Sequence, residues 1–133
     1  MKISIAPRLH RLERMESVLL RKEFLEEIGE EAKLDVQDNI DTEGRNLDDP
    51  WEQSLRAEKQ NGVTLRASNL MYNSIHYEIE GDSVVILGNR KDDQGQDLIT
   101  KHVEGDGVPE RNFMRLSEDC ERSIQQIVDE ALA

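Results

Sequence analysis

The sequence predicts an α+β domain in which helices near both ends of the chain flank a small antiparallel sheet. Three observations support this prediction. Apolar residues recur at helical spacing before residue 40 and again after residue 117, and two strand-like runs meet at a Gly-Asp turn between residues 75 and 88. The 133 residues also fit one domain, 1–133.

The first element is a short edge strand over residues 2–6, where isoleucines alternate with polar residues. Residues 9–40 then predict a long helix, because apolar side chains recur at three- and four-residue steps. Such a helix spans ~45 Å, which is more than a compact domain of this size covers. Two interpretations stay open: a bend near Gly29, or one end that projects toward another subunit.

Residues 41–64 are predicted to form a loop, because Gly, Asn and an Asp-Asp-Pro sequence interrupt the helical pattern. Loops of this length inside compact domains tend to be functional or disordered. Trp51 lies in the middle of the segment. We expect its indole to pin the loop to the core, and stacking on a ligand is the less favoured interpretation.

Residues 65–116 are expected to hold a short helix and the sheet. A helical turn at 68–74 precedes the hairpin at about 75–88, and the apolar segment 98–103, whose type is uncertain, takes the place of a further strand. The last helix occupies 117–133, because Ser117 is a good N-cap and acidic residues follow it in the first turn.

Composition excludes several classes of protein. The chain carries 17 Lys and Arg against 29 Asp and Glu, and the net charge of −12 argues against tight binding to nucleic acid. No apolar run reaches the ~18 residues of a membrane span, and the first six residues are too short and too soon charged for a secretory signal. The single cysteine, Cys120, excludes an internal disulfide and a zinc cluster, which is typical of a reducing cytosol.

No catalytic, cofactor-binding or metal-binding constellation is predicted. His10, His76 and His102 lack metal-ligand spacing, and we expect the last of them to hydrogen-bond backbone near a turn. The acidic loop 92–97 lacks the glycine and glutamate positions of a calcium loop. Cys120 has acidic neighbours, which raise a thiol pKa, so it is expected to be a core residue and a poor nucleophile. The chain is therefore predicted not to be an enzyme.

Five short motifs follow one another along the chain. They are Trp51 with Ser54-Leu55, Leu65-x-x-Ser-Asn-Leu70-x-x-x-Ser74-Ile75, Val84-x-Ile86-x-Gly88, His102-x-x-Gly105, and Val108-Pro109-x-Arg111-x-Phe113-Met114. In this order the chain resembles the phage virion morphogenesis (tail completion) proteins of Mu-like phages and prophages. The candidate structural or assembly residues are Trp51, Leu70, Ile75, Gly88, His102, Gly105, Pro109, Arg111 and Phe113.

The resemblance implies a fold of the tail-terminator and neck-protein kind, whose small subunits assemble into a ring at the head–tail junction or the tail end. The implied partners are copies of the chain itself and other tail, neck or connector proteins, first in the bacterial cytoplasm and then in the virion. Pro109 is expected to stiffen the entry to the last helix. Arg111 is expected to anchor the chain to itself, on a carboxylate or on helix-end carbonyls.

Two other hypotheses stay open. The acidic charge also suits a regulatory or inhibitor module, DNA-mimicking or antitoxin-like, that binds a basic protein in a salt-dependent way. The least favoured hypothesis is a small hydrolase that uses His102 with an aspartate of the 92–97 loop.

Overall fold

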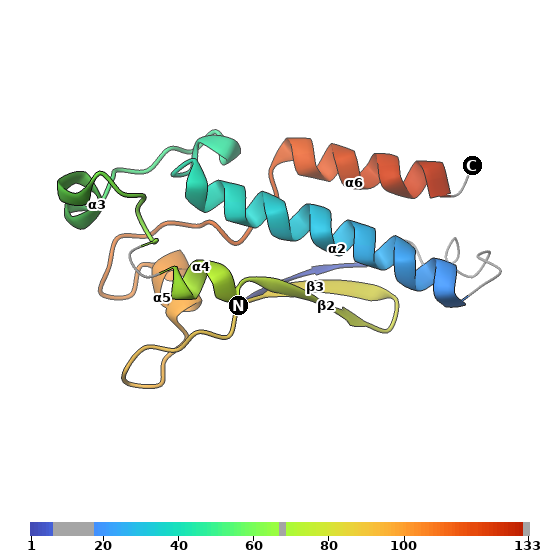
Figure 1. Ribbon diagram of the computed structural model, residues 1–133, viewed down its shortest axis with the longest axis horizontal. Coiled ribbons are helices and arrows are strands. Elements are labelled where there is room, and N and C mark those ends of the chain that lie inside the picture. The colour runs from blue at the N-terminus through green and yellow to red at the C-terminus, as the bar shows by residue number, and fades with distance from the viewer. Residues whose placement is uncertain (7–17, 67–68, 132–133) are drawn as a thin grey trace.

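The computed structural model describes residues 1–6, 18–66 and 69–131, and their elements stack in three layers (Figure 1). The three-stranded sheet forms one outer layer, helix α2 lies in the middle, and helix α6 forms the other outer layer. The elements are β1 (Lys2–Ile5), α2 (Val18–Asp41), the 3-10 turn η1 (Arg45–Leu47), α3 (Leu55–Gln60), α4 (Leu70–Ser74), β2 (His76–Glu80), β3 (Ser83–Leu87), α5 (Leu98–Glu104) and α6 (Glu118–Ala131). The predicted α+β class is confirmed.

The sheet is antiparallel and has the strand order β1-β3-β2. The predicted hairpin is confirmed, since Glu80 pairs with Ser83 and leaves Gly81 and Asp82 as a two-residue turn. Gly81 has a φ of 60°, as the first central position of a type II′ turn requires. The predicted N-terminal strand is also confirmed: β1 pairs with β3 and is one edge of the sheet.

Helix α2 packs along the sheet and is continuous through Gly29. A Cβ atom on Gly29 would lie 2.6 Å from Cγ of Tyr77 on β2, so the missing side chain lets helix and strand approach closely. The described helix begins at Val18 and ends at Asp41, and the long helix over 9–40 stays a prediction. Residues 9–17, where the predicted helix begins, lie outside the described residues.

The prediction of a loop over 41–64 is wrong in part, because η1 and α3 lie inside it. Ser54 is the N-cap of α3 and accepts a hydrogen bond from the Ala57 N–H (3.2 Å), and Asn61 ends the helix with a φ of 52°. These are the ordinary start and stop signals of a helix. The surrounding turn formers conceal them, since α3 has only six residues.

The segment 98–103, whose type the sequence leaves uncertain, is helix α5 and not a further strand. Its start is capped by Asp97, whose carboxylate accepts a hydrogen bond from the Ile99 N–H (3.0 Å), and Gly105 ends it with a φ of 76°. Ile99 and Val103 are the buried residues of α5, and their four-residue spacing is that of a helix face.

Two buried polar side chains of α2 fix the path of the chain into α6. Asn39, which has no exposed surface, donates to the carbonyl oxygens of Phe113 (2.9 Å) and Arg115 (2.8 Å). Asp35 accepts from the backbone N–H of Ser117 (2.8 Å) and from its hydroxyl (2.6 Å). Ser117 in turn accepts from the Cys120 N–H (3.1 Å), which confirms the predicted N-cap.

The core fills the space between α2, the sheet and α6. Of the candidate residues from the sequence, Ile75 and Phe113 belong to this core and have 1% and 0% of their surface exposed. Gly88 lies where β3 ends, and a Cβ atom there would overlap Cδ1 of Ile99 on α5. The absence of a side chain at Gly88 therefore seats α5 against the end of the sheet.

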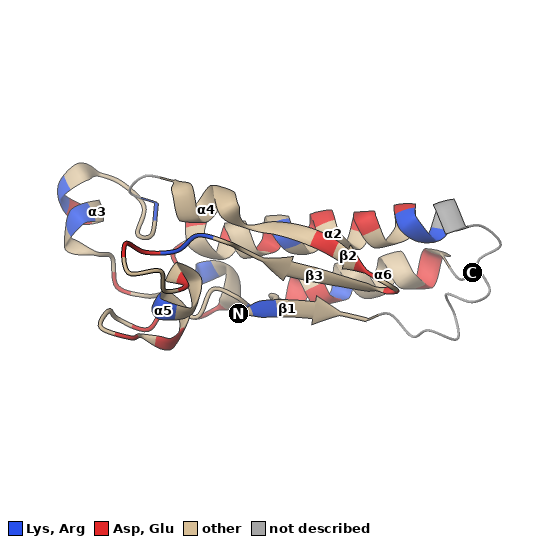
Figure 2. Cartoon of the chain, turned by 90° about the horizontal axis from the view of Figure 1, so that it is seen from below, with Lys and Arg blue, Asp and Glu red and all other residues tan. Residues whose placement is uncertain are grey.

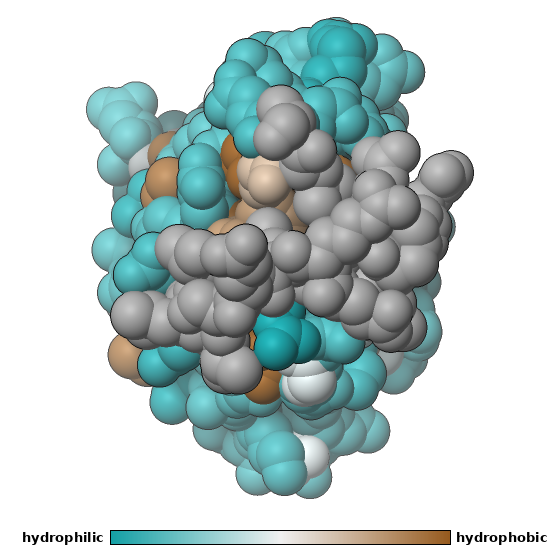
Figure 3. Space-filling view, turned by 90° about the vertical axis from the view of Figure 1, so that its right-hand side faces the viewer, coloured by the Kyte–Doolittle hydropathy of each residue, from teal (hydrophilic) through white to brown (hydrophobic). Residues whose placement is uncertain are grey.

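Most of the described acidic residues, with the exception of the buried Asp35, lie on the surface of these layers. Figure 2 shows Asp and Glu along α2 and α6 and in the loop before α5. At the end of the molecule that holds the β2–β3 turn and the last turn of α6, the described surface is mostly hydrophilic (Figure 3). A chain with a net charge of −12 thus keeps most of its charge solvated.

Candidate functional site

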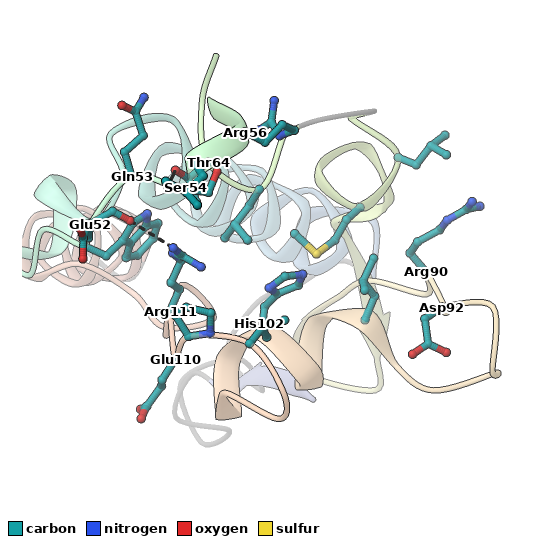
Figure 4. A pocket seen from close by; sticks show the side chains of 18 of the residues that line it. Glu52, Gln53, Ser54, Arg56, Thr64, Arg90, Asp92, His102, Glu110 and Arg111 are labelled. Carbon is teal, nitrogen blue, oxygen red and sulfur yellow. Dashed lines mark hydrogen bonds between the residues drawn. The ribbon is translucent and has the colours of Figure 1, made fainter. Parts of the chain in front are cut away.

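A hollow of about 1030 Å³ lies at the other end of the molecule, where α3, α4 and α5 gather (Figures 1 and 4). Binding sites for small molecules usually measure ~300–1,000 Å³, so this hollow has room for a ligand or several side chains of a partner. Half of the apolar residues that line it are leucines; the apolar lining consists of Trp51, Leu55, Leu65, Leu70, Met71, Leu98, Val108 and Pro109.

Two leucines at the hollow are exposed to solvent. Leu55 has 74% of its surface exposed and Leu70 has 49%, and these are the two most exposed large hydrophobic residues of the described chain, ahead of Leu34 and Met1. Exposed apolar side chains gathered at a concave site are typical of contact surfaces.

One wall is the segment around Trp51, and Glu43 holds it in place. The Glu43 carbonyl accepts from the Trp51 N–H (3.0 Å), and its carboxylate accepts from the Thr64 hydroxyl (2.8 Å). The Thr64 oxygen accepts from the N–H of Ser54 (2.9 Å), just before α3. The indole packs against Gly44, where a Cβ atom would lie 2.7 Å from Trp51 Cε3. The indole is partly buried against the core and also lines the hollow, and its expected role of pinning the loop stays a prediction.

The opposite wall carries His102, which α5 presents to the hollow (Figure 4). Burial lowers the pKa of the imidazole, and the nearby charges of Arg111 and Lys101 lower it further, so the ring is neutral near pH 7. The expected hydrogen bond from this ring to backbone is not found among the described residues, where the buried Nδ1 has no partner. It is the carbonyl of His102 that takes part in the turn, by accepting from the Arg111 N–H (2.9 Å).

Arg111 lies between these two walls. It has 8% of its surface exposed, and Nη2 donates to the carbonyl oxygen of Glu52 (3.1 Å). The guanidinium therefore ties the segment after α5 to the segment before α3, which confirms the prediction of an anchor within the chain. Its partner is a loop carbonyl, not a carboxylate or a helix end. Figure 4 shows Arg111 and His102 both directed into the hollow.

Several residues that line the hollow carry an unpaired buried nitrogen atom. In the described part of the chain four buried side-chain nitrogen atoms have no hydrogen-bond partner, and three of them belong to residues that line the hollow. These three are Trp51 Nε1, His102 Nδ1 and Arg111 Nε. A buried polar group without a partner costs about 1–3 kcal/mol, so each of these three nitrogen atoms would be stabilised by a hydrogen-bond acceptor such as a water molecule or a ligand atom.

The nine candidate residues divide into two groups. Five of them line the hollow: Trp51, Leu70, His102, Pro109 and Arg111. The other four are structural: Ile75 and Phe113 are buried in the core, Gly88 seats α5, and Gly105 ends α5. Sequence reasoning named the five residues but did not predict a hollow. No sequence spacing connects position 51 with position 111.

The aspartates of the 92–97 loop have other partners than His102. Asp97 caps α5, and Asp92 accepts from the N–H groups of Gln94 and Gln96 (both 2.9 Å) and lies 3.7 Å from Lys101 Nζ. Among the described residues no aspartate hydrogen-bonds the imidazole of His102, so none orients it as a general base.

Outside the hollow, two further findings bear on chemistry. No group of three or more His, Cys, Asp or Glu side chains within 1–6, 18–66 and 69–131 is placed to hold a metal ion. Cys120 is buried in the core, as predicted, and burial together with the charges of Asp35 and Glu31 raises the pKa of its thiol to about 12.

Comparison with known proteins adds no relative: the chain matches no protein family, no characterised protein and no solved structure. None of the described helices combines the length and the apolar content needed to cross a membrane.

Proposed function

We propose that this chain is a non-enzymatic structural protein of phage or prophage virion morphogenesis, which assembles with copies of itself, as a ring, in tail completion or head–tail joining. The order of the five motifs in the sequence supports this function. The observation that carries it is the sheet, because both outer strands, β1 and β2, present edges that pair with no other strand of the described chain.

The direction of the two edges suits repeated assembly. Strands β1 and β2 both run antiparallel to β3, so they point the same way. If β1 of one copy pairs with β2 of the next, each copy uses two different surfaces and the contact repeats. Head-to-tail contacts of this kind form a closed ring when the rotation between copies closes.

The charges on the two edges are complementary. Lys2 on β1 is exposed, as are Glu78 and Glu80 on β2. Lys2 pairs with Leu87 of β3, and Glu78 pairs with Val85 of β3. Leu87 and Val85 are two residues apart, so the side chains of Lys2 and Glu78 lie on the same face of the sheet. A β1 edge beside a β2 edge therefore brings opposite charges together, whereas two β2 edges would bring like charges together.

The test removes one edge donor and leaves the sheet intact. In a hairpin with a two-residue turn, the two residues that flank the turn exchange backbone hydrogen bonds, and the hydrogen-bonded pairs then alternate along the strands. The backbone groups of β3 therefore bond to β2 at Ser83, Val85 and Leu87, and to β1 at Val84 and Ile86. Ser4, opposite Val85, consequently points its N–H away from β3. Proline is tolerated at such an outward position and cannot donate.

We expect Ser4→Pro to remain monomeric and the control Ser4→Ala, which keeps the N–H, to assemble as the wild-type chain does. Sedimentation velocity over a wide range of protein concentration measures this, and circular dichroism checks that both variants are folded. A wild-type chain that stays monomeric at every concentration, also with tail or neck proteins present, contradicts the proposal. If that monomer copurifies with a basic nuclease or repressor, the acidic inhibitor module is the better account.

A further inference from the structure

The Arg111 side chain carries a buried charge without a counter-ion. With 8% of its surface exposed, its one hydrogen bond within the described chain goes to the uncharged carbonyl of Glu52, and no carboxylate of the described residues lies within 4.0 Å of its nitrogen atoms. Withdrawing a guanidinium from water is costly unless an anion accompanies it. The geometry therefore calls for an anion from outside the described residues.

The acidic residues around the hollow do not supply that anion. Glu110 is directed away from the hollow in Figure 4, and Asp92 is engaged with Lys101 (3.7 Å) at the far side from Arg111. Glu52 offers its backbone oxygen to Arg111. His102, neutral near pH 7, adds polar atoms but no competing charge.

The rest of the hollow is suited to apolar groups. Leu55 and Leu70 are exposed beside it, and Leu65, Met71 and Leu98 line its wall. A free inorganic anion would satisfy Arg111 but would leave this apolar surface in water. An apolar partner without charge would cover the leucines but would leave the guanidinium unpaired.

We infer that the hollow binds a segment of a partner polypeptide that places a carboxylate against Arg111 and aliphatic side chains against the surrounding leucines. A carboxylate accepts two parallel hydrogen bonds from a guanidinium, which fixes the orientation of the segment. The exposed leucines favour a polypeptide over a small organic acid, because they extend the apolar surface beyond the enclosed part of the site. The hollow and the strand edges are different surfaces, so peptide binding and ring assembly can fail independently.

The probes are two pools of short synthetic peptides that differ at one position. Each pool has randomised aliphatic residues on both sides of a central glutamate or a central glutamine, with free ends blocked and aromatic residues left out. Trp51 is the only tryptophan of the chain and lines the hollow, so its fluorescence reports binding of either pool. Octanoate, an aliphatic acid without a peptide, is the third probe.

We expect the glutamate pool to bind the wild-type chain at least about tenfold more tightly than the glutamine pool, which corresponds to one charge-assisted pair. Arg111→Gln should abolish this preference. Its matched control, Arg115→Gln, removes the same charge from an arginine outside the hollow that pairs with Asp49, and should keep the preference.

A second pair of variants tests the apolar part and avoids the buried arginine. Leu55→Ser changes a residue that is 74% exposed and should fold, yet weaken both pools severalfold. Leu34→Ser changes an exposed leucine on α2, outside the hollow, and should leave both affinities unchanged. Equal affinity of the wild-type chain for the two pools, or binding of neither, overturns the inference. If octanoate binds as tightly as the glutamate pool, the inference of a polypeptide ligand is overturned and the site is assigned to a free organic acid.

Discussion

The buried amide of Asn39 offers the sharpest test of the structure. Its Nδ2 atom donates to the carbonyls of Phe113 (2.9 Å) and Arg115 (2.8 Å), and its Oδ1 accepts from Asn46 Nδ2 (2.7 Å). In Asn39→Ala the two carbonyls lose this donor at a site where the wild-type side chain has no exposed surface. This contact is what holds the segment before α6 against α2.

The expected loss follows from two opposing terms. Each carbonyl left without a partner costs about 1–3 kcal/mol, and alanine returns about 0.6 kcal/mol of helix propensity. The net loss is about 3 kcal/mol, a large part of the ~5–15 kcal/mol by which domains are stable. For a chain of 133 residues this lowers the melting temperature by about 10 °C.

Urea unfolding followed by circular dichroism and by Trp51 fluorescence measures this loss. Asn46→Ala is the matched control, because it removes one partner of Asn39 and leaves both backbone carbonyls paired; we expect it to cost about 1 kcal/mol. If Asn39→Ala costs less than about 1 kcal/mol, or no more than Asn46→Ala, then the two carbonyls do not depend on Asn39 and the described docking of α6 is wrong.

Three further predictions follow from other contacts. Gly29→Ala should lower stability by about 1 kcal/mol, since overlap with the Tyr77 ring outweighs the gain in helix propensity, and a double-mutant cycle with Tyr77→Ala should show that the two changes are coupled. Between about pH 7.5 and 5.5, His102→Gln should make the chain less sensitive to acid and His76→Gln more sensitive, as urea titrations at each pH would show. Burial lowers the pKa of His102, so on acidification the unfolded chain takes up a proton at this site before the folded chain does. The Ser74 carbonyl raises the pKa of His76, so at that site the folded chain takes up the proton first. Cys120, whose thiol pKa is raised to about 12, should react with Ellman's reagent at mildly alkaline pH only after unfolding in urea, and rapid labelling of the native chain would contradict its burial.

Sequence reasoning recovered those elements whose signals are local. The hairpin follows from alternation and a Gly-Asp turn, and α6 follows from Ser117 and the apolar face behind it. Helices α3 and α5 were missed, because their six and seven residues are too few to separate a helical from a strand period.

The hollow could not be predicted from sequence, because tertiary packing creates it. Trp51 and Arg111 are sixty positions apart, and Arg111 is tied to the segment of Trp51 by a hydrogen bond to the backbone carbonyl of Glu52, which any residue type could provide. The contact between the Asp35 carboxylate and Ser117 at the start of α6 could not be predicted either, because no local sequence pattern links these two residues. What sequence could indicate was the unusual residue types themselves, a lone tryptophan and an arginine after a proline.

The contact at Gly88 connects the end of the sheet to α5, which forms part of the lining of the hollow. Because the end of β3 has no side chain there, Ile99 can rest on the backbone, and His102, one turn further along α5, inherits its position. A methyl group at position 88 would overlap Cδ1 of Ile99 and lie 2.9 Å from the Ser74 hydroxyl oxygen, so the Ile99 side chain would have to move. Because Leu98 and His102 on the same helix line the hollow, variants at position 88 test whether the packing of α5 on the sheet affects the hollow from a position outside its lining.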